Sequence, residues 1–219
     1  MRIRFIAREG LAFVIPSLFL SILLYAFHLT VLALVVFFFF LFFLYFFRNP
    51  RRQRPPDAAR LLSPADGRVI EIREIDEKEF LSEKRRRIAI FMSPFDVHVN
   101  RAPCAGRVTA VTHRRGSFAM AFKQEIESAN ERNYIVIDEG GFTVMIVQIA
   151  GFLARRIVSY VRPGDGVSQG STVGMIAFGS RVDVYLPNDF APVVQLQQKV
   201  KAGLTVLAER RGYHEKTQT

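Results

Sequence analysis

The feature that most constrains this chain is an uncharged, apolar segment near its start, between Glu9 and Arg48. A helix rises about 1.5 Å per residue and the hydrocarbon core of a bilayer is about 30 Å thick, so the segment is too long for one crossing. The polar break at His28-Leu29-Thr30 divides it. The pattern therefore predicts two apolar helices, over about 11–27 and 31–47, with His28 as a turn residue that has no chemical role.

Arginines lie on both sides of this segment. Because positive charge tends to stay on the cytoplasmic side, both ends are expected in the cytoplasm, which requires a hairpin. We therefore predict a membrane anchor over 1–48 in the cell (inner) membrane, with the remaining domain on the cytoplasmic face. A secretory signal peptide fits less well, since the apolar run is too long and no small-residue cleavage site follows it.

The charge balance has two readings. The chain has 30 Lys and Arg against 20 Asp and Glu, a net charge of +10, which suits nucleic acid or an anionic membrane surface. The soluble part has no aromatic and basic strip, so nucleic acid is not expected as a partner. The single Cys excludes a disulfide scaffold, and the few scattered His residues do not have the spacing of a metal site.

After the anchor the composition changes at once. Residues 49–60 are rich in Pro and Arg and predict an extended basic linker. Residues 61–208 are long enough for one soluble domain with its own core, and 209–219 form a polar tail.

The soluble domain is predicted to be mainly β. Short strand-like runs recur between Gly and Pro turns, and 3.6-residue periodicity is confined to Ala119–Asn130 and Pro192–Gln198, which predict short helices. The predicted strands are Arg68–Ile75, Arg87–Met92, Arg107–Thr112, Asn133–Asp138, Phe142–Ile149, Thr172–Ile176 and Arg181–Tyr185. Many short strands with turns between them favour an antiparallel sandwich or barrel.

The domain also contains an internal repeat. Pro64-Ala65-Asp66-Gly67-Arg68-Val69 is matched by Pro103-Cys104-Ala105-Gly106-Arg107-Val108, each before an alternating strand. A third turn, 163–170, has the Gly-Asp-x-Val-x-x-Gly style of the barrel-sandwich hybrids of lipoyl and biotinyl domains, which it resembles. Those carriers need a Lys at a hairpin tip and none stands here, so the resemblance is one of architecture. The expected fold is a barrel-sandwich-hybrid-like antiparallel β domain with few short helices.

Few side chains in this domain suit catalysis. Asp66 stands in the Ser-Pro-Ala-Asp-Gly turn and His98 at a strand end. Taken alone, Asp66 reads as a residue that caps its own turn and His98 as an ordinary strand histidine.

Four segments of the soluble domain form one further pattern: Ser63–Val69, Phe95–Pro103, Ala129–Asn133 and Phe178–Asp183. Together they resemble the short, membrane-anchored phosphatidylserine decarboxylases, which are pyruvoyl enzymes. The segments occur in family order along most of the soluble domain, and the last has the greatest weight.

The resemblance implies that the chain cuts itself between Gly179 and Ser180. Ser180 Oγ would attack the Gly179 carbonyl, and later steps would leave a pyruvoyl cofactor at residue 180. A serine hydroxyl needs a base, and the resemblance gives that role to His98, oriented by Asp66. Gly179 has no Cβ, which leaves its carbonyl open to attack.

One departure from the family pattern concerns this base. Longer members have two histidines in the segment that contains His98. In this chain Arg101 stands near the position of the second histidine. His98 is therefore inferred to serve both self-cleavage and decarboxylation, with His113 as a reserve candidate that otherwise reads as a surface strand histidine.

The resemblance further implies conversion of phosphatidylserine to phosphatidylethanolamine and CO₂ through a Schiff base between the substrate amine and the pyruvoyl group. His98 would return the proton to the α-carbon, and Arg101 and Arg181 are secondary candidates for pairing with the lipid phosphate. The mature enzyme would be a heterodimer of a large chain, 1–179, and a small chain, 180–219, with further oligomerisation left open.

Two alternatives remain at this point. One is a decarboxylase of a related serine phospholipid, such as archaetidylserine, because the headgroup chemistry would be the same. The other is a membrane-tethered barrel-sandwich adaptor that does no chemistry, for which the chain would stay intact.

Overall fold

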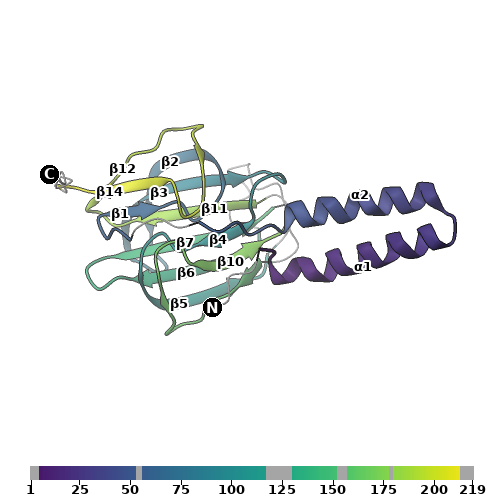
Figure 1. Ribbon diagram of the computed structural model, residues 1–219. Coiled ribbons are helices and arrows are strands. Elements are labelled where there is room, and N and C mark those ends of the chain that lie inside the picture. Colours follow the sequence, from purple (N-terminus) through teal and green to yellow (C-terminus); the bar gives the residue numbers. More distant parts are fainter. Residues whose placement is uncertain (1–4, 53–55, 117–129, 152–156, 178–179, 213–219) are drawn as a thin grey trace. The chain divides into compact units, whose positions relative to one another are not determined.

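The computed structural model describes residues 5–52, 56–116, 130–151, 157–177 and 180–212, and it divides the chain into two compact units (Figure 1). The first unit is Met1–Arg51 and the second is Arg52–Thr219. Each unit is described by itself below.

The first unit is a pair of apolar helices, α1 (Arg8–Ala26) and α2 (Thr30–Phe46). The prediction of two apolar helices with a break at His28 is confirmed, since His28 adopts a φ of 58° in the turn between them. By length and composition α1 is able to cross a membrane, and α2 is apolar but shorter. The fold of this unit is thus consistent with membrane association.

The two helices pack closely because small residues lie between them. The Cβ of a side chain at Gly10 would lie 2.4 Å from the Phe47 Cβ, so only glycine allows this approach. Ser21 Oγ donates to the Ala33 carbonyl at 3.0 Å, which joins the helices nearer their turn. Most of the remaining apolar side chains face outward, for example Val31, which is 76% exposed. Such exposure in a soluble helix pair would be unfavourable, whereas lipid tails would cover it.

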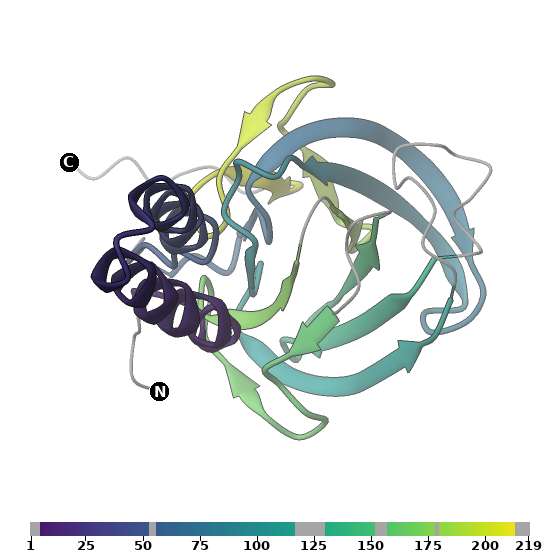
Figure 2. The same cartoon turned by 90° about the vertical axis from the view of Figure 1, so that its right-hand side faces the viewer.

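The second unit is built from antiparallel β-strands, which confirms the predicted fold class. One long sheet has the strand order β13-β2-β3-β11-β7-β6-β5-β9, and it curls around the core (Figure 2). Its strands are β2 (Gly67–Glu77), β3 (Glu83–Met92), β5 (Gly106–Arg114), β6 (Arg132–Asp138), β7 (Thr143–Ala150), β9 (Gly166–Val167), β11 (Ser180–Leu186) and β13 (Lys199–Val200).

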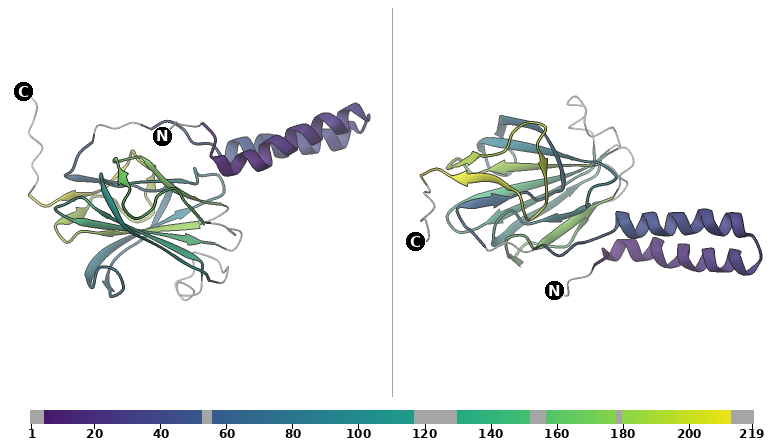
Figure 3. Two further views of the ribbon diagram at one scale, coloured as in Figure 1. Left: turned by 90° about the horizontal axis from the view of Figure 1, so that it is seen from below. Right: turned by 45° about the horizontal axis from the view of Figure 1, so that its top comes forward.

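Two small sheets complete the unit, with strand orders β1-β14-β12 and β4-β10-β8 (Figure 3). Their strands are β1 (Arg60–Leu62), β14 (Val206–Arg210), β12 (Phe190–Pro192), β4 (Val99–Arg101), β10 (Thr172–Ile176) and β8 (Ile157–Ser159).

The internal sequence repeat is a structural duplication. Gly67 begins β2 with a φ of 150° and Gly106 begins β5 with a φ of 149°. A Cβ at Gly67 would lie 2.1 Å from the Phe91 carbonyl oxygen, and one at Gly106 would lie 2.4 Å from that of Asp138. Glycine is therefore required twice for the same reason, because a neighbouring strand's backbone crosses at this point.

Hydrogen bonds repeat in the same way. Val69 N donates to Gln198 O at 3.0 Å, and Val108 N donates to Asp165 O at 2.8 Å. The register irregularity that follows Val69 in the β2–β3 pair recurs after Val108 in the β5–β6 pair. The long sheet is thus made of two equivalent halves, β13-β2-β3-β11 and β9-β5-β6-β7, which meet where β11 pairs with β7.

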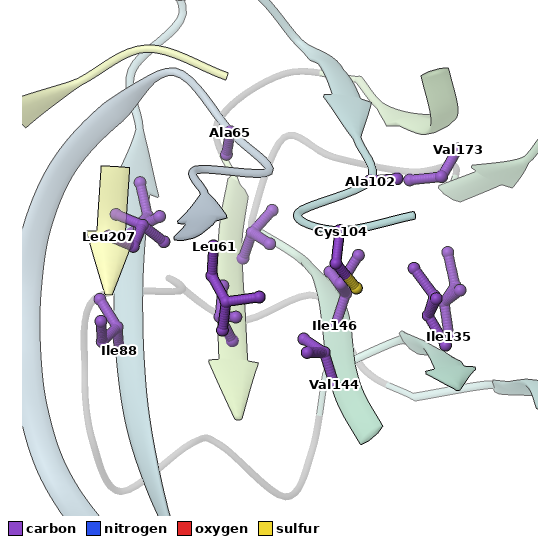
Figure 4. Packing of buried hydrophobic residues seen from close by; sticks show 14 of the residues in the cluster. Leu61, Ala65, Ile88, Ala102, Cys104, Ile135, Val144, Ile146, Val173 and Leu207 are labelled. Atoms are coloured by element: carbon purple, nitrogen blue, oxygen red, sulfur yellow. The ribbon is translucent and has the colours of Figure 1, made fainter. Parts of the chain in front are cut away.

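The apolar core lies inside the curled sheet and receives side chains from the long sheet and from both small sheets (Figure 4). Ile88 in β3 and Ile135 in β6 come from the long sheet. Leu61 in β1 and Leu207 in β14 come from one small sheet, and Ala102 follows β4 of the other. All five are fully buried. A second cluster on the other face of the sheet includes Tyr134, Met145 and Tyr185.

The helix predicted over Pro192–Gln198 is wrong. Pro192 ends β12, where it pairs with Ala208, and Gln197 takes a φ of 67° in a turn that donates from its N–H to Val69 O at 2.8 Å. Backbone bonding to neighbouring strands has replaced the local helix here. The helix predicted over Ala119–Asn130 lies, apart from Asn130, outside the described residues.

The last residues of the predicted linker and the first residues of the predicted tail belong to the β unit. Arg60 belongs to β1 and Arg210 to β14, and Asp57 N donates to Gln169 Oε1 at 2.8 Å.

Candidate active site

Ser180 is the first residue of β11, the central strand of the long sheet. It lies opposite Met92, the last residue of β3, and opposite Ala150, the last residue of β7. Both neighbouring strands therefore end where β11 begins. Ser180 thus lies at one end of the central strand, between the ends of β3 and β7.

The Ser180 side chain is fully buried on the core side of the sheet. Its Oγ donates to the Met92 Sδ at 3.5 Å. A thioether is a weak acceptor, so this bond orients the hydroxyl without holding it strongly. Breaking this weak bond costs little when the hydroxyl turns toward a base.

His98 is also fully buried, on the segment between β3 and β4. Its Nδ1 lies 2.9 Å from the Asp96 carbonyl oxygen. A carbonyl oxygen only accepts, so Nδ1 must donate its proton there, and in the neutral ring Nε2 then has the lone pair of a base. Asp96 is itself fixed, because its carboxylate accepts from Ser93 N at 2.8 Å and from Ser93 Oγ at 2.7 Å.

The backbone links His98 to the segment before Ser180. Ile176, the last residue of β10, donates from its N–H to the His98 carbonyl at 3.3 Å. Ile176 precedes Ser180 by four residues, which span at most about 14 Å of extended chain. Phe178 and Gly179, which form the predicted cleavage motif with Ser180, lie outside the described residues.

Asp66 makes its described hydrogen bonds to Arg52 and Ala202, and none to His98. Arg52 contacts both carboxylate oxygens, with Nη2 at 2.7 Å from Oδ2, and Ala202 N donates to Oδ1 at 2.8 Å. The side chains of Arg52 and Asp66 are only 8% and 11% exposed. The ring-orienting contact expected from Asp66 is thus made by the Asp96 carbonyl.

The two segments that contain Asp66 and His98 nevertheless meet. The Pro64 carbonyl, in the Asp66 turn, accepts from Arg101 N at 2.9 Å. Arg101 donates from Nη1 to the Gly170 carbonyl at 2.8 Å. Burial lowers the pKa of the Arg101 guanidinium, and the positive charge of Arg52 lowers it further, against the opposing effect of Asp66.

Comparison with known proteins identifies the family of this arrangement. The family model described as phosphatidylserine decarboxylase matches residues 39–208. The chain belongs to the phosphatidylserine decarboxylase family. It is therefore a decarboxylase, made as a proenzyme, and the adaptor alternative falls away.

Relatives named phosphatidylserine decarboxylase proenzyme match most of the chain. That of Carboxydothermus hydrogenoformans is 48% identical over 75% of this chain and 78% of its own length. That of Desulfotalea psychrophila is 42% identical over 93% of this chain and 96% of its own length. That of Syntrophus aciditrophicus is 43% identical over 91% and 94%.

Within this decarboxylase, Arg181 lies on the opposite face of the sheet from Ser180, because successive side chains alternate along β11. Its Nε donates to Asp183 Oδ1 at 2.6 Å and its Nη2 to Asp183 Oδ2 at 3.0 Å, and Arg87 lies 3.4 Å from the same carboxylate. Arg181 is 1% exposed. This buried position favours a structural role for Arg181 over contact with a lipid phosphate.

Two other side chains, His113 and Cys104, have the surroundings of ordinary strand and core residues. His113 is exposed in β5 and pairs with Glu131 at 3.1 Å, as expected of a surface strand histidine. Cys104 packs in the core, as expected of a small apolar residue. Burial, with the negative charges of Glu139 and Asp138, raises the pKa of its thiol to about 12.

A basic hollow lies at the other end of β11, about 20 Å from Ser180 at the usual rise of a strand. It is lined by Glu74, Lys84, Arg85, Arg86, Pro187, Asn188, Phe190 and Arg211. Among the described residues, its lining includes none of those named above for the Ser180 site, so we treat it as a separate feature.

Three contributors to the site were missed from the sequence: Met92, Asp96 and Arg52. Met92 ends a predicted strand and Asp96 lies within a family segment, so both positions were in view. The signal for Arg52 was hidden in a run of arginines that reads equally well as a membrane-facing cluster.

Proposed function

We propose that this chain matures by cutting its own Gly179–Ser180 bond. Ser180 Oγ attacks the Gly179 carbonyl carbon while its proton passes to His98 Nε2, and the Ser180 nitrogen leaves that carbon as the Oγ ester forms. Removal of the Ser180 α-proton then expels Gly179 as a carboxylate together with Oγ. Water replaces the nitrogen, which leaves as ammonia, so that residue 180 becomes a pyruvoyl group.

The observation that carries this proposal is the state of the His98 ring. With Nδ1 donating to Asp96 O at 2.9 Å, Nε2 is the basic atom of a buried imidazole. The backbone bond between His98 O and Ile176 N keeps that base beside the segment that leads to Ser180. A base in a buried site is suited to taking the proton from a hydroxyl.

The surroundings of residue 180 fit a pyruvoyl group. The position is fully buried, lies between two strand ends, and has as its described side-chain partner a thioether, which does not form a stable adduct with a reactive carbonyl. When present, the group supplies an electron sink for the loss of CO₂.

We propose phosphatidylserine as the substrate, with phosphatidylethanolamine and CO₂ as products. His98 would hold the proton that returns to the substrate α-carbon. Arg101 is the arginine on the same segment as His98 and would pair with the lipid phosphate, and the positive charge of Arg52 near it would add to the attraction. Asp66 would act through its electrostatic effect on Arg101.

The apolar helices suit an enzyme whose substrate has two acyl chains. We propose that residues 1–48 anchor the chain in the cell (inner) membrane, that 49–60 connect the anchor, and that the catalytic domain of 61–208 lies on the cytoplasmic face. Cleavage would leave a heterodimer of 1–179 and 180–219, with the polar tail 209–219 on the small chain. A headgroup could then react without full extraction of the lipid into water.

The substrate proposal is tested with the purified full-length chain and vesicles that contain phosphatidylserine. Release of CO₂ in step with formation of phosphatidylethanolamine is expected, and prior treatment with hydroxylamine, which captures carbonyl groups, is expected to abolish both. Activity that survives hydroxylamine would contradict the pyruvoyl group. A lack of activity on vesicles that contain phosphatidylserine would contradict the proposed substrate.

A further inference from the structure

A chain of buried side-chain amides leads from the core face of the long sheet toward Ser180. Asn133 in β6 donates from Nδ2 to Gln148 Oε1 at 2.8 Å, and Gln148 in β7 donates from Nε2 to Asn100 Oδ1 at 2.8 Å. Asn100, in β4, continues toward the site. Each of the three residues is at most 1% exposed. Buried amides linked in one direction behave as a unit, because rotating one amide by 180° breaks the bonds of its neighbours.

The direction of the chain is set at its Asn100 end. Asn100 Nδ2 lies 3.5 Å from the Pro64 carbonyl oxygen, which only accepts, and 3.7 Å from the Met92 Sδ. The amino group must therefore face these two atoms, while Oδ1 faces Gln148. The opposite orientation would set the Asn100 oxygen against a carbonyl oxygen and a sulfur.

Met92 joins this chain to Ser180. Its sulfur accepts from Asn100 Nδ2 at 3.7 Å and from Ser180 Oγ at 3.5 Å. A methionine side chain is unbranched and usually adapts to its surroundings. Two donors on one sulfur restrict it, so the amide chain acts on the direction in which the Ser180 hydroxyl points.

The fold itself does not require amides at these positions. In the duplicated half, the residue equivalent to Asn100 is Leu61, since both precede the register irregularity of their small sheet. The residue equivalent to Gln148 is Leu186, which pairs with Arg86 as Gln148 pairs with Asn133. Leu61 and Leu186 are fully buried. The half of the domain that contains amides is thus the half that bonds to the Met92–Ser180 pair.

A glycine makes room for this exchange. Asn100 pairs with Gly174, and a Cβ at Gly174 would lie 2.6 Å from the Val158 carbonyl oxygen and 2.8 Å from Gln148 Nε2. The equivalent partner of Leu61 is Ala208. Glycine at position 174 therefore makes room for both the Val158 backbone and the Gln148 carboxamide.

We propose that Asn100, Gln148 and Asn133 are positioning residues for Ser180, which act through Met92 to aim the hydroxyl for self-cleavage. The inference rests on the proposed self-cleavage, and it assigns to these amides an effect on its rate rather than on folding. Polar networks whose bonds are all made can fix one arrangement of a buried site.

The test copies the other half of the domain into this one. The variant Asn100→Leu with Gln148→Leu replaces the amide pair by the pair found at Leu61 and Leu186. Replacing both partners of a buried hydrogen bond by apolar groups can be nearly neutral for stability. Asn133 Nδ2 loses its acceptor in this variant, so we expect a melting temperature within about 10 °C of the wild-type chain and self-cleavage slowed at least about tenfold, followed by intact mass in the full-length chain.

A second measurement keeps the inference testable if this variant does not fold. The single variants Met92→Leu and Asn100→Leu, and their combination, form a double-mutant cycle on the cleavage rate. Because Asn100 acts through the Met92 sulfur, we expect the combination to cleave within about threefold of the slower single variant. Tyr185→Phe, on the opposite face of the sheet, is the control and should cleave at the wild-type rate.

Two results would overturn the inference: wild-type cleavage rates in the folded leucine variants, or rate losses in the cycle that multiply. Both are distinct from failure of the proposed function, in which the wild-type chain itself would stay uncut.

Discussion

His98 donates its Nδ1 proton to the carbonyl of Asp96, two residues before it, at 2.9 Å. The contact is local, and Asp96 is held by its own bonds to Ser93. The loop after β3 thus sets the orientation of the imidazole through a backbone carbonyl rather than through an acidic side chain. The base of the proposed self-cleavage and its orienting group belong to one short segment.

Replacing the imidazole should therefore stop maturation. His98→Ala removes the proton acceptor for Ser180, and a general base contributes about 10²–10⁴-fold, so we expect cleavage to slow by at least about 100-fold. Denaturing electrophoresis over time measures the fraction of uncut chain. His113→Ala is the matched control and should cleave normally, because His113 is exposed and pairs with Glu131. Efficient cleavage of the His98 variant would remove His98 as the base.

Asp66 and Arg52 should behave as one buried pair. Asp66→Asn leaves Arg52 without its carboxylate, and loss of one partner from a buried pair costs about 3–5 kcal/mol of unfolding free energy. Arg52→Gln should cost a similar amount, and the double variant should cost much less than the sum, as measured by chemical denaturation. Additive losses would contradict the pairing. A slower cleavage in Asp66→Asn without loss of stability would instead restore Asp66 as a group that acts on His98.

Arg181 should affect stability rather than substrate binding. Arg181→Met breaks the bidentate pair with Asp183 in a position that is 1% exposed, and we expect a loss of about 3 kcal/mol, near the lower end for such pairs because Arg87 remains close to Asp183. Arg73→Met is the control, since Arg73 is half-exposed and its pair with Glu71 should be worth less than about 1 kcal/mol. An increase in KM with unchanged stability would show that Arg181 contacts the lipid.

Cys104 should resist alkylation in the folded chain. Burial raises the pKa of its thiol to about 12, so the thiol stays protonated at pH 8–9 and has little access to reagent. In the unfolded chain the thiol ionises near its ordinary value of 9.0, so this group lowers stability as pH rises from about 9 toward 12. Iodoacetamide labelling followed by mass measurement should be fast only after unfolding; fast labelling of the native chain would contradict the burial.

The sequence predicted the fold best where a short pattern of residues reflects one structural requirement. The matching turns at Gly67 and Gly106 predicted a repeat, and the structure gives the reason, since a neighbouring backbone crosses each glycine. Alternating patterns located the long strands, because successive side chains of a strand point to opposite faces of the sheet. The short strands, such as β1 and β4, have too few residues for an alternating pattern to be visible.

Other parts of the site depend on contacts that no sequence pattern records. The acceptor for His98 is a backbone carbonyl, which every residue has, and the partner of Ser180 is a thioether, which has no characteristic spacing. Asp66 was expected to act on the histidine, but its ion pair is with Arg52, which reaches it from the predicted linker. Pro192–Gln198 has helical spacing, yet its backbone bonds to β2 and β14 instead.

The central claim, self-cleavage at residue 180, is tested most directly by the intact mass of the full-length chain under denaturing conditions. We predict two species in the wild type, 1–179 and 180–219, with the smaller one lighter by one ammonia than a fragment that begins with an unmodified serine, and without a free amino terminus. Ser180→Ala should give one uncut species, 1–219. A single full-length species in an active wild-type preparation would contradict the account.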